Sequence, residues 1–333
     1  MTGRYRFVIE GLICGMLVMV GLLWIAPGPL FSLISQDYGI NRAAVGLTTS
    51  IMSLAMGAAA VPAGILSNKI GLRKSFTIGA FLMSAGLLTP FASDISLLIA
   101  TRIVTAIGIA MLFPIASGIV MQWFKSEALP VINGINISAT SIGNSIALFL
   151  TFVIAGALDW KKALALYGAF ALLLAFAWLF LGREVKKTVV AAEDHAPFKI
   201  GRILRQRETL LLGLCVAGPY TMFMGLSSWL PSYYHEVFGM SLAQGGFITG
   251  LAPLFGIPAC IAGGILPLRI GVRRPFLFTS GVVLVFAGLG TFLFNNLAVI
   301  YVSIALTGIA VMFFQPTIFT IAMELPGANP RTA

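Results

Sequence analysis

Charged side chains are scarce in this sequence: Asp, Glu, Lys and Arg make up 10% of its 333 residues, whereas soluble domains average about 25%. Histidine occurs twice and cysteine three times, and no cysteine has a second Cys or a His at metal-ligand spacing. No metal and no cofactor is therefore predicted, and Cys14, Cys215 and Cys260 are interpreted as small core residues. Blocks of like charge are absent too, which argues against disorder and against nucleic-acid binding.

Catalytic patterns are missing as well. The sequence contains no HExxH motif, and no pair of carboxylates stands inside an apolar run where it could perform acid–base chemistry. We therefore expect that the chain is not an enzyme.

Apolar residues are abundant, at 59% of the sequence. A helix that crosses the roughly 30 Å hydrocarbon core of a bilayer needs about 20 consecutive apolar residues. We predict an all-α membrane protein, because stretches of that length follow one another along the chain. There are ten, at residues 7–33, 43–67, 75–93, 96–123, 131–157, 162–182, 209–233, 242–267, 275–294 and 297–323.

The basic residues predict how these helices are oriented. Most of the 21 Lys and Arg residues fall in loops on the same side as the N-terminus, and such loops are cytoplasmic by the positive-inside rule. We expect a multi-pass protein of the cell membrane, monomeric and in contact with lipid, with both termini in the cytoplasm. This asymmetry explains the net charge of +10 without an acidic macromolecular partner.

An internal repeat divides the chain. Shifted by 200 positions, residues 64–73 match 264–273 at several Gly, Ile, Leu and Arg positions, and 108–113 match 308–313. Six helices separate the copies, so both copies run the same way across the bilayer, as in carriers built from parallel repeats. We predict three parts: an N-terminal six-helix half at 1–182, a cytoplasmic linker at 183–208 and a C-terminal half with four helices at 209–333.

The first copy of the repeat is longer than the second. It continues through two further helices to about residue 182, whereas the second copy reaches the end of the sequence after four helices. We expect twelve helices in the full-length protein, with this sequence truncated after the tenth. The alternative is a genuine ten-helix protein.

The turns at the two copies share a motif. Residues 64–74 read G-I-L-S-N-K-I-G-L-R-K, and residues 264–274 read G-I-L-P-L-R-I-G-V-R-R. Both resemble the cytoplasmic loop signature of the major facilitator superfamily (MFS), although Asn68 replaces the usual aspartate. The resemblance implies an MFS-type bundle and a gating role for Gly64, Asn68, Gly71, Arg73, Lys74, Gly264, Gly271, Arg273 and Arg274.

Arg102 is a basic residue inside a predicted span, where an arginine costs at least about 2.5–3.5 kcal/mol on insertion scales. It should therefore face a watery cavity or a partner; the alternative is that it extends to the outer interface. The stretch 102–108, R-I-V-T-A-I-G, is similar to the R-x-x-x-G-x-G helix of the MFS. That resemblance implies a role in substrate binding or proton coupling.

Polar residues also mark the fifth stretch. Asn133, Asn136, Thr140 and Asn144 recur at intervals of three and four residues and so share one helix face. They either line a substrate path or hydrogen-bond to a neighbouring helix, with the glycines at 134 and 143 allowing close approach. The same helix lacks the pattern of the family's drug/proton antiporters, which argues against drug export by proton exchange.

Prolines interrupt two equivalent helices, at Pro27 and Pro29 in the first stretch and at Pro219 and Pro231 in the seventh. Interrupted helices at matching places indicate a binding site between the two halves. The candidate substrate contacts there are the aromatic and amide side chains of Trp24, Tyr220, Trp229 and Gln315. For the aromatic residues the alternative role is packing or anchoring at the membrane interface.

Glu10 is the carboxylate that lies well within a predicted span. Intramembrane carboxylates often carry protons, so Glu10 is the candidate coupling group for a co-transported proton or ion. The alternative is an interfacial ion pair with Arg4 or Arg6, which precede it in the sequence.

These features predict a secondary carrier that moves a small solute by alternating access of its two halves. One fixed cation and few carboxylates within the spans favour a small anion or a weak organic acid as substrate. The chain also loosely resembles the cyanate and nitrate/nitrite type permeases. Two alternatives stay open: a non-transporting membrane sensor derived from a carrier fold, and an MFS exporter of small organic compounds.

Overall fold

The computed structural model describes residues 2–125, 128–184 and 206–324. Every regular element in these segments is a helix, which confirms the predicted all-α class. The elements are α1 (Thr2–Ile25), η1 (Gly28–Leu30), α2 (Phe31–Tyr38), α3 (Arg42–Ile70), α4 (Leu72–Met83), η2 (Ser84–Phe91), α5 (Ile95–Trp123), α6 (Leu129–Leu158), α7 (Trp160–Leu181), α9 (Arg207–Phe238), α10 (Leu242–Ile270), α11 (Arg274–Leu293) and α12 (Leu297–Glu324).

Nine helical segments in the described part of the chain are long and apolar enough to cross a membrane. The remaining predicted stretch, 75–93, is divided between α4 and the 3₁₀ helix η2. At about 1.5 Å per α-helical residue and about 2.0 Å per 3₁₀ residue, the two together reach about 34 Å, which is enough for a bilayer core. η2 lies so close to α7 that a Cβ atom on Gly168 would collide with the backbone of Leu87.

The helices end at two faces of the bundle. The face that we call the basic face carries the turns after α3 and α10, with the cations that follow them. Gly71 and Gly271 end these two helices at φ of +89° and +75°, a backbone region that favours glycine. The other face, which we call the opposite face, carries the turns between α2 and α3 and between α9 and α10.

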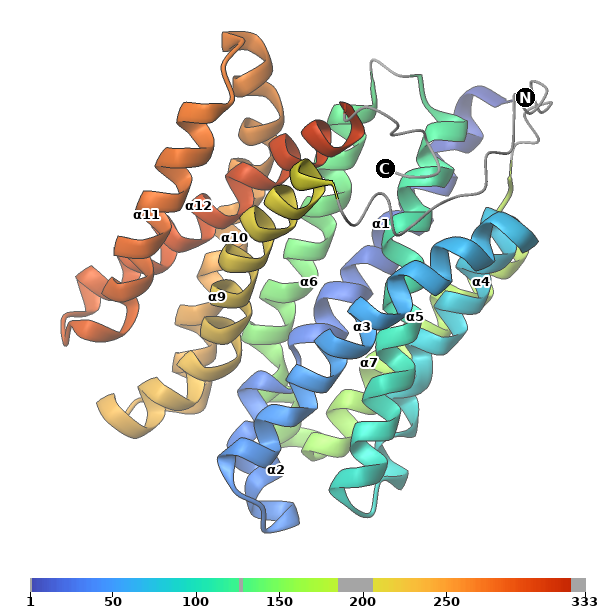
Figure 1. Cartoon of the computed structure of the whole chain (residues 1–333). Coiled ribbons are helices and arrows are strands. Elements are labelled where there is room, and N and C mark those ends of the chain that lie inside the picture. Colours follow the sequence, from blue (N-terminus) through green and yellow to red (C-terminus); the bar gives the residue numbers. More distant parts are fainter. Residues whose placement is uncertain (1, 126–127, 185–205, 325–333) are drawn as a thin grey trace.

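The helices form two groups (Figure 1). The first group, α1 to α7, surrounds a large buried apolar core to which α1 contributes along most of its length. The second group, α9 to α12, has its own buried cluster, which includes Phe223, Ile248 and Ile304. α6 lies between the groups and packs against α1 on one side and α10 on the other. Residues 185–205 of the predicted linker lie outside the described segments.

The contact between α1 and α6 depends on a small residue. A Cβ atom on Gly143 of α6 would collide with the carbonyl oxygen of Val18, whereas Gly134 has no neighbouring atom within 4 Å. Close approach is therefore provided by Gly143 and not by Gly134. It brings the polar face of α6 directly against the second half of α1.

Candidate functional site

A small cavity lies where the two helix groups meet. Its volume is about 10 Å³, which is room for roughly one water molecule. Helices α1, α5 and α6 contribute from the first group, and α9 and α12 from the second. The lining residues are Trp24, Phe113, Ile137, Thr140, Ser141, Asn144, Tyr220, Phe223, Met224, Met312 and Gln315. The structure thus brings together Thr140, Asn144, Tyr220 and Gln315, which the sequence analysis selected separately.

Two aromatic rings close this central cavity, one from each group. The indole of Trp24 stacks on the ring of Tyr220, with 6.5 Å between centroids and 21° between planes. The Tyr220 hydroxyl in turn donates to Oε1 of Gln315 at 3.5 Å. The halves therefore meet through an aromatic stack, which must separate before a solute larger than water can enter.

Polar atoms at this cavity lack partners. Nε1 of Trp24 and Oδ1 of Asn144 are both buried, and neither makes a hydrogen bond within the described structure. Buried polar groups in folded proteins nearly always have a partner, so such exceptions need a functional or solvent explanation. One donor and one acceptor are thus left without partners on two residues that line the cavity.

Arg102 lies behind the cavity and does not line it. The side chain is 4% exposed. Its Nη1 donates to the carbonyl oxygen of Leu23 at 2.7 Å, and its Nη2 donates to that of Trp24 at 3.2 Å. Arg102 therefore faces a partner within the protein, the backbone of α1, and does not extend to the interface.

The position of Pro27 explains this contact. In a continuing helix the carbonyl of Leu23 would accept from the N–H of residue 27, and proline has none. α1 accordingly ends at Ile25. The guanidinium satisfies the freed carbonyls, and it places a positive charge at the negative end of the helix dipole. Arg102 thus fixes the end of α1, which carries Trp24.

The proline interruption predicted for the seventh stretch is wrong. Pro219 and Pro231 both lie inside α9, which runs as one α-helix over 32 residues. A proline inside a membrane helix is tolerated when neighbouring groups satisfy the backbone carbonyl that it leaves without a donor. The described helices are therefore interrupted by proline at the end of α1 but not at the equivalent helix, α9.

Other predicted site residues lie elsewhere. Asn136 is 6% exposed and lies near Cys14, whose thiol is 3.5 Å from Oδ1 of Asn136 and 3.7 Å from Oε1 of Glu10. Asn133 is half-buried and is absent from the central cavity. Trp229 lines a different cavity on the opposite face.

Glu10 does not form the ion pair that was its alternative role. It is 8% exposed, and the ion pairs within 4.0 Å in the described segments involve other residues. Its Oε2 is buried without a hydrogen-bond partner. The Cys14 thiol, which contacts Oε1 of Glu10, also contacts Asn136 of α6, so Glu10 lies beside the contact between α1 and α6.

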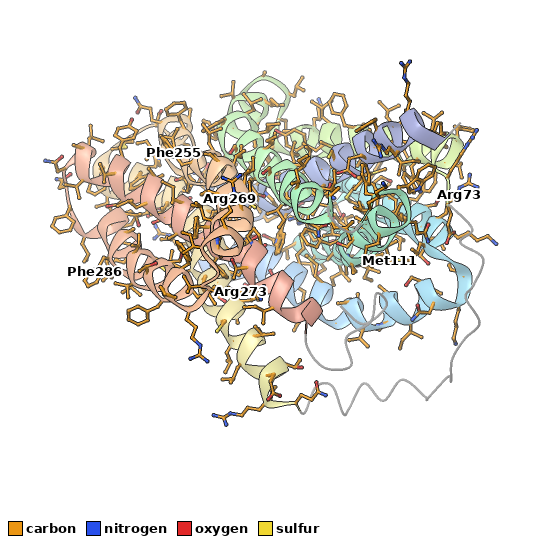
Figure 2. All side chains as sticks on the ribbon, turned by 90° about the horizontal axis from the view of Figure 1, so that it is seen from above. Arg73, Met111, Phe255, Arg269, Arg273 and Phe286 are labelled. Atoms are coloured by element: carbon orange, nitrogen blue, oxygen red, sulfur yellow. The ribbon has the colours of Figure 1, made fainter. Side chains whose placement is uncertain are left out.

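The predicted gating residues lie on the basic face, which is seen from above in Figure 2. Nη2 of Arg73 donates to the carbonyl of Leu179 at 3.0 Å, near the end of α7. Arg73 therefore belongs to the first group, well apart from Arg269 and Arg273 of the second group (Figure 2). Asn68, Lys74 and Arg274 are exposed there, and Gly64 and Gly264 are half-buried near the ends of their helices.

Comparison with protein families gives a match over nearly the whole chain. The model described as Major Facilitator Superfamily matches residues 13–333. An uncharacterized protein of Campylobacter jejuni is 27% identical over 91% of this chain and 96% of its own. A probable sulfoacetate transporter of Cupriavidus necator is 25% identical over 86% and 70%, and a nitrite extrusion protein of Bacillus subtilis is 27% identical over 84% and 71%.

Solved structures share the fold. A bacterial homolog of the human lysosomal transporter Spinster, in its inward-facing and unoccupied conformation, superposes with a TM-score of 0.78. The match covers 100% of this chain and 78% of the other, at 15% identity. A D-xylose–proton symporter superposes with a TM-score of 0.74, over 98% of this chain and 85% of the other, at 14% identity.

The role of Arg102 can be tested by stability. Arg102→Ala leaves two buried carbonyls without donors, each costing about 1–3 kcal/mol, so we expect a clearly lower melting temperature in detergent. Arg102→Lys restores one donor and should recover part of the loss. Thr101→Ala, one residue earlier on α5, is the control. A melting temperature unchanged by Arg102→Ala would contradict the capping of α1.

Proposed function

Because the chain belongs to the Major Facilitator Superfamily, whose model matches residues 13–333, we propose that it carries a small organic anion across the membrane by alternating access. That it is a transporter of small solutes and not an enzyme follows from the family and from the transporters among its relatives. The observation that carries the proposal is the central cavity between the two groups, closed by Trp24 and Tyr220.

Charge favours an anion as the substrate. The residues that line the central cavity include no carboxylate. The guanidinium of Arg102 lies directly behind it, hydrogen-bonded to the backbone of Trp24. Similar proteins are named as carriers of sulfoacetate, nitrite and 4-hydroxybenzoate; all three are anions at neutral pH. A carboxylate or sulfonate could accept a hydrogen bond from the free indole N–H of Trp24.

The closed cavity favours alternating access. A space of about 10 Å³ holds no solute larger than water, so transport requires the groups to separate on one face at a time. In this proposal residues 1–182 and 209–333 are the two moving halves, joined by a linker at 183–208. The basic face is the cytoplasmic one, and the loop residues after α3 and α10 control the opening of the halves there. The protein acts as a monomer in the cell membrane.

Glu10 is proposed to carry the coupled proton. Among the described residues it is the carboxylate that is buried, at 8% exposure. Oε2 of Glu10 has no hydrogen-bond partner, and Oε1 contacts the Cys14 thiol rather than a cation. The carboxylate can therefore bind and release a proton without breaking an ion pair. The cluster of Glu10, Cys14 and Asn136 lies between α1 and α6, the two helices that also carry Trp24 and Asn144.

Transport is tested with purified protein in liposomes. We expect saturable, protein-dependent uptake of 4-hydroxybenzoate or sulfoacetate, whereas neutral benzyl alcohol should enter only by non-saturable diffusion. Trp24→Phe and Asn144→Ala each remove a buried polar group worth about 1–3 kcal/mol, so the initial rate should fall about 5- to 150-fold. Trp123→Phe, which removes an indole outside the cavity, should transport normally. Anion binding without flux would contradict a carrier and favour a sensor.

Coupling is tested by a proton gradient across the same liposomes. If Glu10 carries the proton, an acidic outer solution should drive sulfoacetate accumulation in liposomes that hold the native protein, and Glu10→Gln should still exchange sulfoacetate but not accumulate it. Glu208→Gln, which neutralises an exposed carboxylate at the start of α9, is the matched control. Gradient-driven accumulation that survives Glu10→Gln would rule this residue out as the proton carrier.

A further inference from the structure

A second and larger cavity opens between the two groups on the opposite face. Its volume is about 340 Å³, within the range typical of small-molecule sites. One wall comes from α2 and the start of α3, and the other from the last turns of α9. Its lining combines aromatic and polar side chains. The aromatic ones are Phe31, Trp229 and Tyr233, and the polar ones include Ser32, Gln36, Arg42, Ser232 and Glu236. The proposed transport function assigns no role to this site.

Two serines face this cavity from the two halves of the molecule. The hydroxyl oxygens of Ser32 and Ser232 are buried, and neither has a hydrogen-bond partner. Ser232 is 8% exposed. The two positions are 200 residues apart, so they are equivalent in the internal repeat. A pair of equivalent hydroxyls on either side of one cavity is available to donate to an acceptor that enters between the halves.

An ion pair crosses the rim of the same cavity. Nη2 of Arg42 at the start of α3 lies 2.8 Å from Oε2 of Glu236 near the end of α9. The pair joins the two halves, and both side chains stay accessible to solvent, at 72% and 40% exposure. An exposed pair of this kind is weak, so another anion can compete with Glu236 for the guanidinium.

We propose that this cavity binds a small carboxylate or sulfonate with an apolar body. The anion accepts hydrogen bonds from Ser32 and Ser232 and replaces Glu236 on Arg42, while its apolar part packs against Trp229. This exchange replaces the ion pair between Arg42 and Glu236 with a ligand that contacts both halves. The inference goes beyond the proposed function, because binding here does not require the central cavity.

Titration with benzoate, followed by tryptophan fluorescence, tests the site in the purified protein. We expect a saturable change that disappears in Trp229→Phe. Arg42→Gln, and the double variant Ser32→Ala with Ser232→Ala, should raise the half-saturating benzoate concentration at least tenfold. Glu236→Gln should lower the half-saturating benzoate concentration two- to fivefold, because residue 236 then no longer competes with benzoate for Arg42. Benzyl alcohol, which has no charge, should produce no such response.

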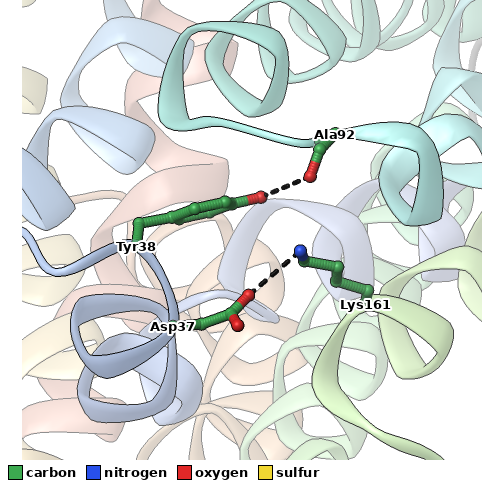
Figure 3. Close-up of polar contacts among 4 residues, drawn as sticks. All are labelled: Asp37, Tyr38, Ala92 and Lys161. Atoms are coloured by element: carbon green, nitrogen blue, oxygen red, sulfur yellow. Dashed lines mark hydrogen bonds and ion pairs between the residues drawn. The ribbon is translucent and has the colours of Figure 1, made fainter.

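A second ion pair on the same face supplies the control. Nζ of Lys161 lies 3.0 Å from Oδ2 of Asp37, beside the hydrogen bond from the Tyr38 hydroxyl to the carbonyl of Ala92 (Figure 3). This cluster joins α2 to α7 within the first group and does not border the cavity. Lys161→Gln should therefore leave benzoate binding unchanged.

Binding at the opposite face and transport through the central cavity can be distinguished by variants in each cavity. Asn144→Ala, which acts in the central cavity, should bind benzoate at the opposite face like the native protein. Binding that depends on Arg42 in a protein without anion flux would support this site and contradict the proposed function. A half-saturating concentration that is the same in Arg42→Gln and the native protein would overturn the site, whatever the transport assay gives.

Discussion

A membrane helix must satisfy every backbone carbonyl inside the protein, because the bilayer core offers no water. Pro27 breaks this rule at the end of α1, since it cannot donate to the carbonyl of Leu23. Arg102 restores it with two hydrogen bonds from α5. That contact gives two of the guanidinium nitrogens partners inside the protein and ends α1 at a defined residue. It also fixes Trp24 where the two halves meet, so the geometry of the central cavity depends on it.

The two halves face each other at two cavities, one in the centre of the bundle and one on the opposite face. The central one is closed by the stack of Trp24 on Tyr220, and the one on the opposite face is bridged by Arg42 and Glu236. Both contacts pair one residue from each half, and neither buries an ion pair in the low-dielectric interior, where separation would be costly. An aromatic stack and an exposed ion pair are contacts that a carrier can make and break repeatedly.

The fold was largely predictable because hydropathy decides it. The ten predicted stretches correspond to the observed helices with two exceptions: 7–33 covers α1, η1 and the start of α2, and 75–93 is divided between α4 and η2. A count of apolar residues cannot detect these divisions. Helix periodicity selects Thr140 and Asn144, and the matching proline-containing helices select Tyr220; in the structure these three residues and Gln315 line one cavity. The partner of Arg102 was not predictable, because Leu23 and Arg102 are 79 positions apart and only tertiary packing joins them. The contact between Cys14 and Asn136, 122 positions apart, was missed for the same reason.

The central claim is that the two halves separate on one face at a time around the central cavity. It is tested most directly by pulsed electron-spin distances in a cysteine-free background, with one label pair at Lys69 and Arg269 on the basic face and another at Ala43 and Val237 on the opposite face. These four positions are exposed and sit on helices of different halves. The account predicts that adding substrate anion shifts the two distances in opposite directions. Distances that both stay fixed, or that change together, would contradict it.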